Sequence, residues 1–269
     1  MAPTIVLLIR HGETAWNAVK RIQGQIDIPL SEVGLAQAEA LARRWTASIA
    51  GAAADSTPDG GDAGGLAAIA GAPLIGEVGS SVPRDASAWV APLSAIVSSD
   101  LSRAMQTAAP LLRVLAPDAA ATDVVQAVGL RERLFGVFER HDKAAIAQRW
   151  PAAYAQWITH DPDFAPESGE SIRTLSQRVV QTLGEQARRY AGGTIACVAH
   201  GGVLDCALRF AQGVALDAPR PGVLLNASIN ALRWYPGQTP AEDRAEVLAW
   251  GDVAHLGDFD AKGVGDDRV

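Results

Sequence analysis

The chain has 269 residues, of which 48% are hydrophobic, and carries a formal net charge of −7. This length and composition predict a globular protein of one to two domains, with enough chain to bury a sizeable core. The acidic balance argues against nucleic acid or an anionic membrane as a partner, because the field over most of the surface repels phosphates. No apolar run approaches the roughly 18 residues of a membrane span. We also expect no signal peptide, because residues 1–9 lack a basic segment and a cleavage site.

Short apolar runs alternate with helical periodicities along the chain. Runs at residues 4–9, 93–97, 124–125, 194–199, 223–234 and 245–250 predict strands. Apolar residues at helical spacing predict helices over 31–46, 101–115, 168–192 and 203–211. This alternation predicts the α/β class, a three-layer α/β/α sandwich with a mostly parallel sheet covered on both faces. Cys197 and Cys206 are too few for a disulfide framework, so we expect buried thiols in a reducing, cytoplasmic compartment.

Residues 50–87 differ in character from the rest of the chain. They are rich in Ala, Gly, Ser, Asp and Pro and show no sustained period. Such a composition buries too little apolar surface to offset chain entropy, which predicts a flexible insertion. A small lid is the alternative, because residues 66–75 are mildly apolar. We expect one domain over 1–255, interrupted by this insertion, and a loose tail over 256–269.

Polar residues follow the predicted strands at the points where those strands end. They are Arg10 and His11, then Ser98, Asp100 and Arg103, then Arg131 and Glu132, and finally His200 and Gly201. Because parallel strands end at the same edge of a sheet, we expect these side chains to converge there. Histidines, arginines and a carboxylate at one edge predict an anion site with an acid–base or nucleophilic system inside it.

The segments that carry these residues resemble the histidine phosphatase superfamily, the phosphoglycerate-mutase-like proteins. The motifs are RHGETAWN at 10–17, RIQGQ at 21–25, PLSEVG at 29–34, SSDLSRA at 98–104, LRE at 130–132, SGES at 168–171, AHGG at 199–202 and NAS at 226–228. They follow one another in the family's order from residue 4 to about residue 235, outside the insertion. The resemblance implies a phosphoglycerate-mutase-like fold and a histidine-phosphatase-like catalytic domain. It departs at Phe138 and Arg140, where relatives usually have the aromatic residue and the glycine of Trp-Glu-Gly.

The resemblance also implies a role for each residue. His11 would be the nucleophile that forms a phosphohistidine. Arg10, Arg103 and His200 would surround the phosphoryl oxygens. Glu132 would protonate the leaving oxygen and then activate water.

Four further residues would line the entry for phosphate and substrate: Asn17, Gln23, Gly24 and Gly201. Glu13 and Glu170 are expected to be structural, beside helix starts where carboxylates are favourable. No metal and no cofactor are expected, because the arginines and histidines compensate the phosphate charge.

The family contains both phosphatases and cofactor-dependent mutases. A mutase must shield its phosphohistidine from water, and in the mutase branch a longer segment before the SGES motif does so. The segment over 133–168 is short here, so we expect a metal-independent phosphomonoesterase. A cofactor-dependent phosphoglycerate mutase is the alternative. The partner would be a small phosphorylated substrate, held around residues 20–30, 133–168 and 220–230, and the oligomeric state is left open, a homodimer included.

Two other classes of protein are less compatible with the sequence. A metal-dependent hydrolase would use paired histidines at H-x-H or H-E-x-x-H spacing, and His11 and His200 do not have that spacing. A binding protein without catalysis would have lost the nucleophile or an arginine, and all of these are present.

Overall fold

A computed structural model describes residues 1–54, 82–89, 92–115 and 123–257. A six-stranded sheet, in the order β3-β2-β4-β1-β5-β6, forms its centre. The strands are β1 (Thr4–Arg10), β2 (Ala95–Ser98), β3 (Val125–Gln126), β4 (Thr194–Ala199), β5 (Ile229–Tyr235) and β6 (Arg244–Asp252). The first four pair in parallel, whereas β5 runs antiparallel to β1 and β6 antiparallel to β5. The predicted, mostly parallel α/β sheet is therefore confirmed.

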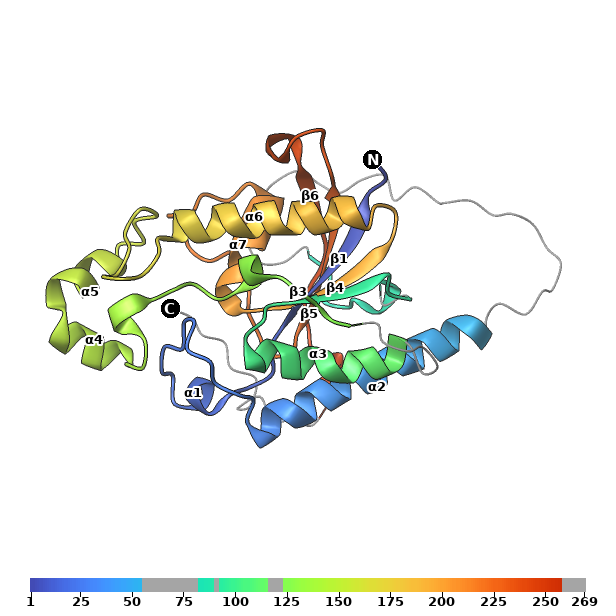
Figure 1. Cartoon of the computed structure of the whole chain (residues 1–269), viewed down its shortest axis with the longest axis horizontal. Helices are drawn as coiled ribbons and strands as arrows, with labels where there is room; N and C mark the ends of the chain where they lie inside the picture. The colour runs from blue at the N-terminus through green and yellow to red at the C-terminus, as the bar shows by residue number, and fades with distance from the viewer. Residues whose placement is uncertain (55–81, 90–91, 116–122, 258–269) are drawn as a thin grey trace.

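Helices cover both faces of this sheet (Figure 1). One face carries α2 (Glu32–Ala54) and α3 (Ser102–Leu115), and the other carries α6 (Ile172–Arg189) and α7 (Gly201–Gln212). Successive residues of a strand point to opposite faces. Accordingly, Val6 and Leu8 of β1 belong to the core beneath α6 and α7, while Leu7 and Ile9 belong to the core beneath α2 and α3. β1 is thus buried on both sides, and the three-layer prediction holds.

A small helical lobe, residues 135–164, projects beyond the end of the sheet (Figure 1). It contains α4 (Lys143–Arg149) and α5 (Pro151–Trp157). The Asp142 side chain caps α4 by accepting from the Ala145 amide at 2.8 Å. The lobe has a core of its own around Phe138, Ile146 and Trp157, separate from the two sheet cores. These helices were not predicted from the sequence. The single turn α1 (Ala15–Ala18) follows Glu13, where a helix start was expected without stated bounds.

Several predicted boundaries differ from the structure. The strand expected over 223–234 begins only at Ile229, because the chain turns at Ala227, whose φ of 54° is left-handed. The helix expected to end near residue 46 continues to Ala54, so the first residues of the expected insertion are helical. α7 begins at Gly201, two residues earlier than predicted.

Residues 82–87 of the expected insertion are described, and Ala86 is buried in the core beneath α2 and α3. Leu256, the first residue of the expected loose tail, is buried as well. Residues 55–81 and the tail from 258 lie outside the described residues.

Two further features of the described residues bear on the sequence predictions. Cys197 and Cys206 are both buried free thiols, and burial raises the pKa of Cys197 to about 12. Across the described ranges, no helix combines the length and apolar character needed to cross a bilayer.

Candidate active site

A cavity of about 920 Å³ lies at the carboxyl ends of β1 and β4, between the sheet and the helical lobe. All the residues predicted as catalytic or substrate-binding line it except His200, which packs against His11. The lining ones are Arg10, His11, Asn17, Gln23, Gly24, Arg103, Glu132 and Gly201. The fold therefore brings together residues that are up to 191 positions apart in the sequence.

His11 is held by backbone groups immediately after β1. Its amide donates to the Ala199 carbonyl at 3.0 Å, which extends the pairing of β1 with β4 by one residue. Its Nδ1 lies 2.6 Å from the Gly12 carbonyl oxygen. A carbonyl only accepts, so Nδ1 carries the proton and Nε2 keeps a lone pair. Burial, reinforced by Arg103 and Arg10, lowers the pKa of His11 well below its ordinary value, so the ring is neutral at pH 7.

His200 is the second imidazole of the site and the N-cap residue of α7. Its ring centroid lies 5.1 Å from that of His11, and it is fully buried. Neither of its ring nitrogens has a hydrogen-bond partner among the described residues. Burial, followed by the charge of Arg103, lowers its pKa well below the ordinary value. The site thus holds two neutral imidazoles side by side.

Two buried arginines supply the positive charge beside these histidines. Arg10 is 2% exposed and donates to the Leu224 carbonyl. Arg103 is 1% exposed, and its guanidinium donates to the carbonyls of Ile26 at 2.9 Å and Gly24 at 2.7 Å. Burial lowers the pKa of Arg103 to about 10, so it stays cationic at neutral pH. Two buried cations favour binding of an anion between them.

A threonine that the sequence did not single out connects the histidine loop to the arginine helix. The Thr107 hydroxyl accepts from the Gly12 amide at 3.0 Å and donates to the Arg103 carbonyl at 2.8 Å. It stands one helical turn after Arg103, so its spacing was a clue to this position. Gly12 itself leaves no room for a side chain, since a Cβ there would lie 2.6 Å from the Gly34 carbonyl oxygen.

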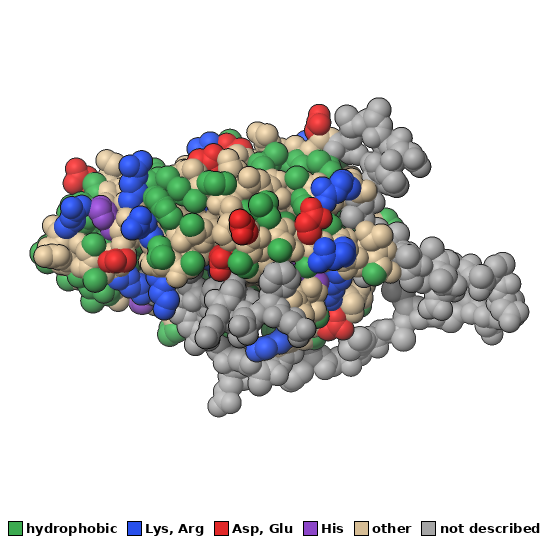
Figure 2. Space-filling view, turned by 90° about the horizontal axis from the view of Figure 1, so that it is seen from below, with side chains coloured by type: hydrophobic (Ala, Val, Ile, Leu, Met, Phe, Trp, Pro, Cys, Tyr) green, Lys and Arg blue, Asp and Glu red, His purple; other side chains and the backbone are tan. Residues whose placement is uncertain are grey.

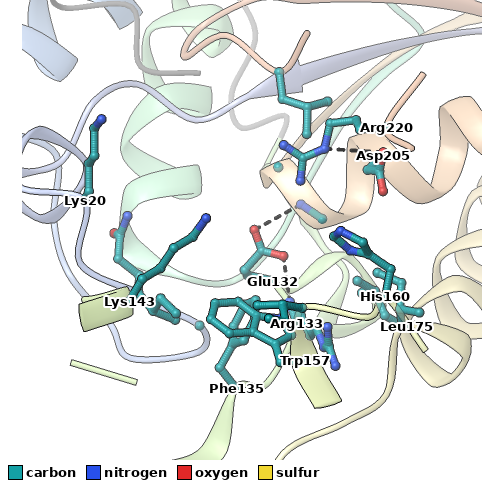
Figure 3. Close-up of a pocket in the computed structure, with 18 of the residues that line it drawn as sticks. Lys20, Glu132, Arg133, Phe135, Lys143, Trp157, His160, Leu175, Asp205 and Arg220 are labelled. Atoms are coloured by element: carbon teal, nitrogen blue, oxygen red, sulfur yellow. Dashed lines mark hydrogen bonds and ion pairs between the residues drawn. The ribbon is translucent and has the colours of Figure 1, made fainter. Parts of the chain in front are cut away.

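Glu132 supplies the carboxylate of the cavity. Its two oxygens accept from the Arg133 amide at 2.7 Å and from the Gly202 amide, in the first turn of α7, at 3.1 Å. Figure 3 shows this carboxylate between the Arg220 guanidinium and the rings of Phe135 and Trp157. The carboxyl group is therefore oriented by two backbone donors while it faces the cavity.

The outer wall combines charged and apolar groups from the segments predicted to hold the substrate. Residues 20–24, nine residues of the helical lobe, and Arg220 and Leu224 all contribute. Of the α7 residues that line the cavity, the sequence predicted Gly201 but missed Asp205 and Arg209. Asp205 accepts from the Arg209 Nε at 2.9 Å and lies 3.6 Å from the Arg220 Nε. The i, i+4 spacing of an acid and an arginine was the available clue. Trp157 both packs in the lobe core and lines the cavity.

The charge of this cavity is opposite to that of the whole chain. Eight Lys or Arg and four Asp or Glu residues line it, whereas the chain carries −7. Figure 2 shows Lys and Arg side chains grouped at the end of the molecule that α4 and α5 form. A locally basic cavity on an acidic protein concentrates small anions without attracting polyanions. Within the described part of the chain, no cluster of three or more His, Cys, Asp or Glu could hold a metal ion.

Comparisons with known proteins agree with this geometry. The family model of the histidine phosphatase superfamily (branch 1) matches residues 6–57 and 85–246. A metal-independent phosphoserine phosphatase of Arabidopsis thaliana is 31% identical over 256 residues, covering 94% of this chain and 83% of the relative. A probable phosphoglycerate mutase GpmB of Enterobacter sp. is 29% identical over 251 residues, covering 93% of this chain and 94% of the relative. The solved structure of Bacillus stearothermophilus YhfR superposes with a TM-score of 0.66 at 25% identity, covering 94% of this chain and 99% of that one.

The chain belongs to the histidine phosphatase superfamily, branch 1. Within that superfamily it is a phosphoric monoester hydrolase. The phosphatase prediction and the phosphoglycerate-mutase-like fold prediction made from the sequence are both confirmed.

Proposed function

We propose that this phosphatase works without a metal, transferring the phosphoryl group of a small phosphorylated metabolite first to His11 and then to water. The observation that carries the proposal is the state of His11. Its Nδ1 is bound to the Gly12 carbonyl at 2.6 Å, and its ring is buried and neutral beside Arg10 and Arg103. A neutral imidazole with a lone pair on Nε2, facing a cationic anion site, is a nucleophile for phosphorus.

In the first step Nε2 of His11 attacks phosphorus and the P–O bond to the leaving alcohol breaks. Protonated Glu132 gives its proton to the leaving oxygen, which departs as a neutral alcohol. The incoming phosphate dianion favours that protonated form, because it places negative charge beside the carboxyl group. Arg10 and Arg103 stabilise the equatorial oxygens, and neutral His200 donates its one N–H to them.

In the second step the Glu132 carboxylate takes a proton from a water molecule as the water oxygen attacks the phosphohistidine. The N–P bond breaks, inorganic phosphate leaves, and both His11 and protonated Glu132 are restored. Asn17, Gln23, Gly24 and Gly201 border the entry through which phosphate and substrate pass. No step requires a charge that these side chains do not supply.

Phosphoserine is the first substrate to test, because the Arabidopsis thaliana relative at 31% identity is named as a phosphoserine phosphatase. The cavity also accepts larger alcohols, because its outer wall extends from Lys20 to Arg220. We place the reaction in the reducing cytoplasm, a placement supported by the free thiols of Cys197 and Cys206.

A phosphoglycerate mutase is the second candidate, favoured by the Enterobacter relative named as a probable phosphoglycerate mutase. A mutase returns the phosphoryl group from the histidine to a second hydroxyl, so it must keep water out for longer. Isomerisation of 3-phosphoglycerate in the presence of bisphosphoglycerate, faster than release of inorganic phosphate, would favour this activity over hydrolysis.

The decisive experiment traps the phosphoenzyme. The protein is mixed in chelator with ³²P-labelled p-nitrophenyl phosphate and quenched in alkaline detergent, where a phosphohistidine survives. We expect label and turnover in the wild type and neither in His11→Ala. The matched control is His141→Ala, since His141 pairs with Arg149 away from the cavity lining and should keep both. Labelling that persists in His11→Ala would refute the proposed nucleophile.

A further inference from the structure

Arg178, on α6, binds the chain segment that leads to Glu132. Its Nη1 donates to the carbonyls of Gly129 at 2.9 Å and Arg131 at 2.7 Å, and its Nη2 donates to the Glu132 carbonyl at 2.9 Å. One side chain therefore donates hydrogen bonds to three backbone carbonyls within four residues. This segment is a single turn of 3-10 helix followed by an irregular stretch, so it has no sheet or α-helix ladder to hold it.

Glu170 fixes the Arg178 guanidinium in turn. The pair is bidentate, with Nη2 to Oε1 at 2.5 Å and Nε to Oε2 at 3.1 Å. Bidentate arginine–carboxylate pairs hold both groups in a defined plane. The side chains are only 23% and 13% exposed, so solvent screens this pair less than a surface pair.

The SGES motif that contains Glu170 also binds the chain on the far side of Glu132. The Glu170 amide donates to the Leu134 carbonyl at 2.8 Å, and the Glu170 carboxylate accepts from the Leu134 amide at 2.9 Å. The Arg133 Nε donates to the Glu170 carbonyl at 2.9 Å. Gly169 permits this close approach, since a Cβ there would lie 2.8 Å from the Leu134 carbonyl oxygen.

Glu132 thus lies between two stretches of chain that are held by hydrogen bonds. Arg178 holds the stretch before it and Glu170 the stretch after it, and these two residues form one ion pair. We propose that Glu170 and Arg178 are positioning residues that hold the Glu132 carboxyl group at the leaving oxygen. The inference rests on the proposed role of Glu132 and extends it to a motif that the sequence assigned only to a helix start. Neither residue lines the cavity, so both act through Glu132.

The leaving group provides a test that a purely structural role would not pass. The anion of an acidic phenol leaves a phosphate ester without a proton donor, whereas the anion of unsubstituted phenol needs one. Loss of the general acid therefore lowers the rate of hydrolysis only for the ester of unsubstituted phenol. The parameter kcat/KM reports the phosphoryl-transfer step in both cases. Partial unfolding lowers it by the same factor for every substrate.

We would measure kcat/KM for 2,4-dinitrophenyl phosphate and phenyl phosphate in the wild type, Glu132→Gln and Arg178→Met. Both variants should lose about 100-fold on phenyl phosphate and less than about fivefold on 2,4-dinitrophenyl phosphate. Glu170→Gln should show the same pattern more weakly, and Arg178→Lys should recover part of the loss. The matched control is Arg173→Met, on the same helix, whose ion pair with Asp163 is exposed; it should resemble the wild type.

The outcomes separate the two claims. Suppose that Glu132→Gln loses kcat/KM mainly on phenyl phosphate while Arg178→Met loses it by the same factor on both substrates. This result would overturn the positioning role and leave the proposed acid in place. A uniform loss in Glu132→Gln would overturn the role of Glu132 itself. If Arg178→Met does not fold, Glu170→Gln and Arg178→Lys carry the same comparison, and a uniform loss in both would refute the positioning role.

Discussion

The imidazoles of His11 and His200 pack 5.1 Å apart, centroid to centroid, within reach of two buried guanidinium groups. Protonating either ring would add a third positive charge to a site that already holds Arg10 and Arg103. Both pKa values are therefore lowered, with burial as the largest cause. Burial, reinforced by the cations that also bind phosphate, therefore keeps the nucleophile unprotonated.

This arrangement predicts that the folded protein is destabilised by mild acid. In the unfolded chain both histidines return to a pKa of about 6.5. Below that pH the unfolded state binds protons that the folded state does not, so the free energy of unfolding falls as pH falls. His255, whose pKa burial lowers to about 4, acts in the same direction. Above about pH 6.5 these histidines are mostly neutral in both the folded and the unfolded state, so their contribution to the free energy of unfolding no longer changes with pH.

Urea unfolding between pH 7.5 and 5.5 measures this effect. Each histidine contributes at most about 1.4 kcal/mol per pH unit to the slope. His11→Asn should remove the share of the slope that His11 contributes. A free energy of unfolding that stays flat across this range in the wild type would contradict the prediction.

Removing the Thr107 hydroxyl should destabilise the loop that carries the nucleophile. Thr107→Val preserves shape but leaves the Gly12 amide buried without its acceptor, at a cost of about 1–3 kcal/mol. Thr107→Ser keeps the hydroxyl and should restore most of the stability and the kcat. Equal losses in the valine and serine variants would indicate that the methyl group, and not the hydrogen bond, matters.

Arg140→Gly should stabilise the protein. Arg140 has a φ of 73°, in the left-handed region, where a side chain is strained and glycine is favoured. Its amide donates to the Ile22 carbonyl at 2.9 Å, so the backbone conformation is set by the loop. We expect a gain of about 0.5–1 kcal/mol in thermal unfolding. Arg140→Ala keeps the strain and should gain nothing; an equal gain there would refute the backbone explanation.

Trp157→Ala should loosen the helical lobe and leave the sheet intact. Trp157 is 8% exposed and packs on Phe138 with ring centroids 5.4 Å apart, in a core separate from those of the sheet. Deleting a buried Trp costs about 3–5 kcal/mol. Hydrogen exchange should therefore accelerate over 135–164 but not in β1 or β4, and KM should rise. Gln156→Ala, at an exposed position of the same helix outside the cavity lining, is the control; acceleration throughout the sheet would refute an independent lobe.

The sheet could be predicted from the sequence because its central strands are continuous apolar runs buried on both faces, as at Leu7 and Leu8. The candidate site residues came from short motifs at strand ends, which the fold then gathers around one cavity. Thr107 and Arg178 could not be predicted in this way. Thr107 contacts Gly12 from 95 positions away, and Arg178 contacts Glu132 from 46 positions away. The spacing of Thr107 from Arg103 indicates a shared helix face but does not indicate the contact with Gly12.

The helical lobe escaped prediction for a different reason. Its helices have seven residues each, too short for an apolar period to emerge, and Trp150 both ends α4 and precedes α5. The cap at Asp142 and the proline at position 151 were the available local markers. The structure also explains why the sequence can depart from the family pattern at Phe138 and Arg140. Phe138 packs in the lobe core, and neither residue lines the cavity.

The position of β1 between β4 and β5 has a consequence for synthesis. His11 precedes Ala199 by 188 residues and Asn226 by 215 residues in the chain, yet its loop is held by both. At 5–20 residues per second, the first strand waits about 10–40 s for its neighbours. During that interval an apolar segment with two unpaired edges is exposed to chaperones and to other nascent chains. The catalytic centre therefore cannot assemble until both β4 and β5 have been synthesised.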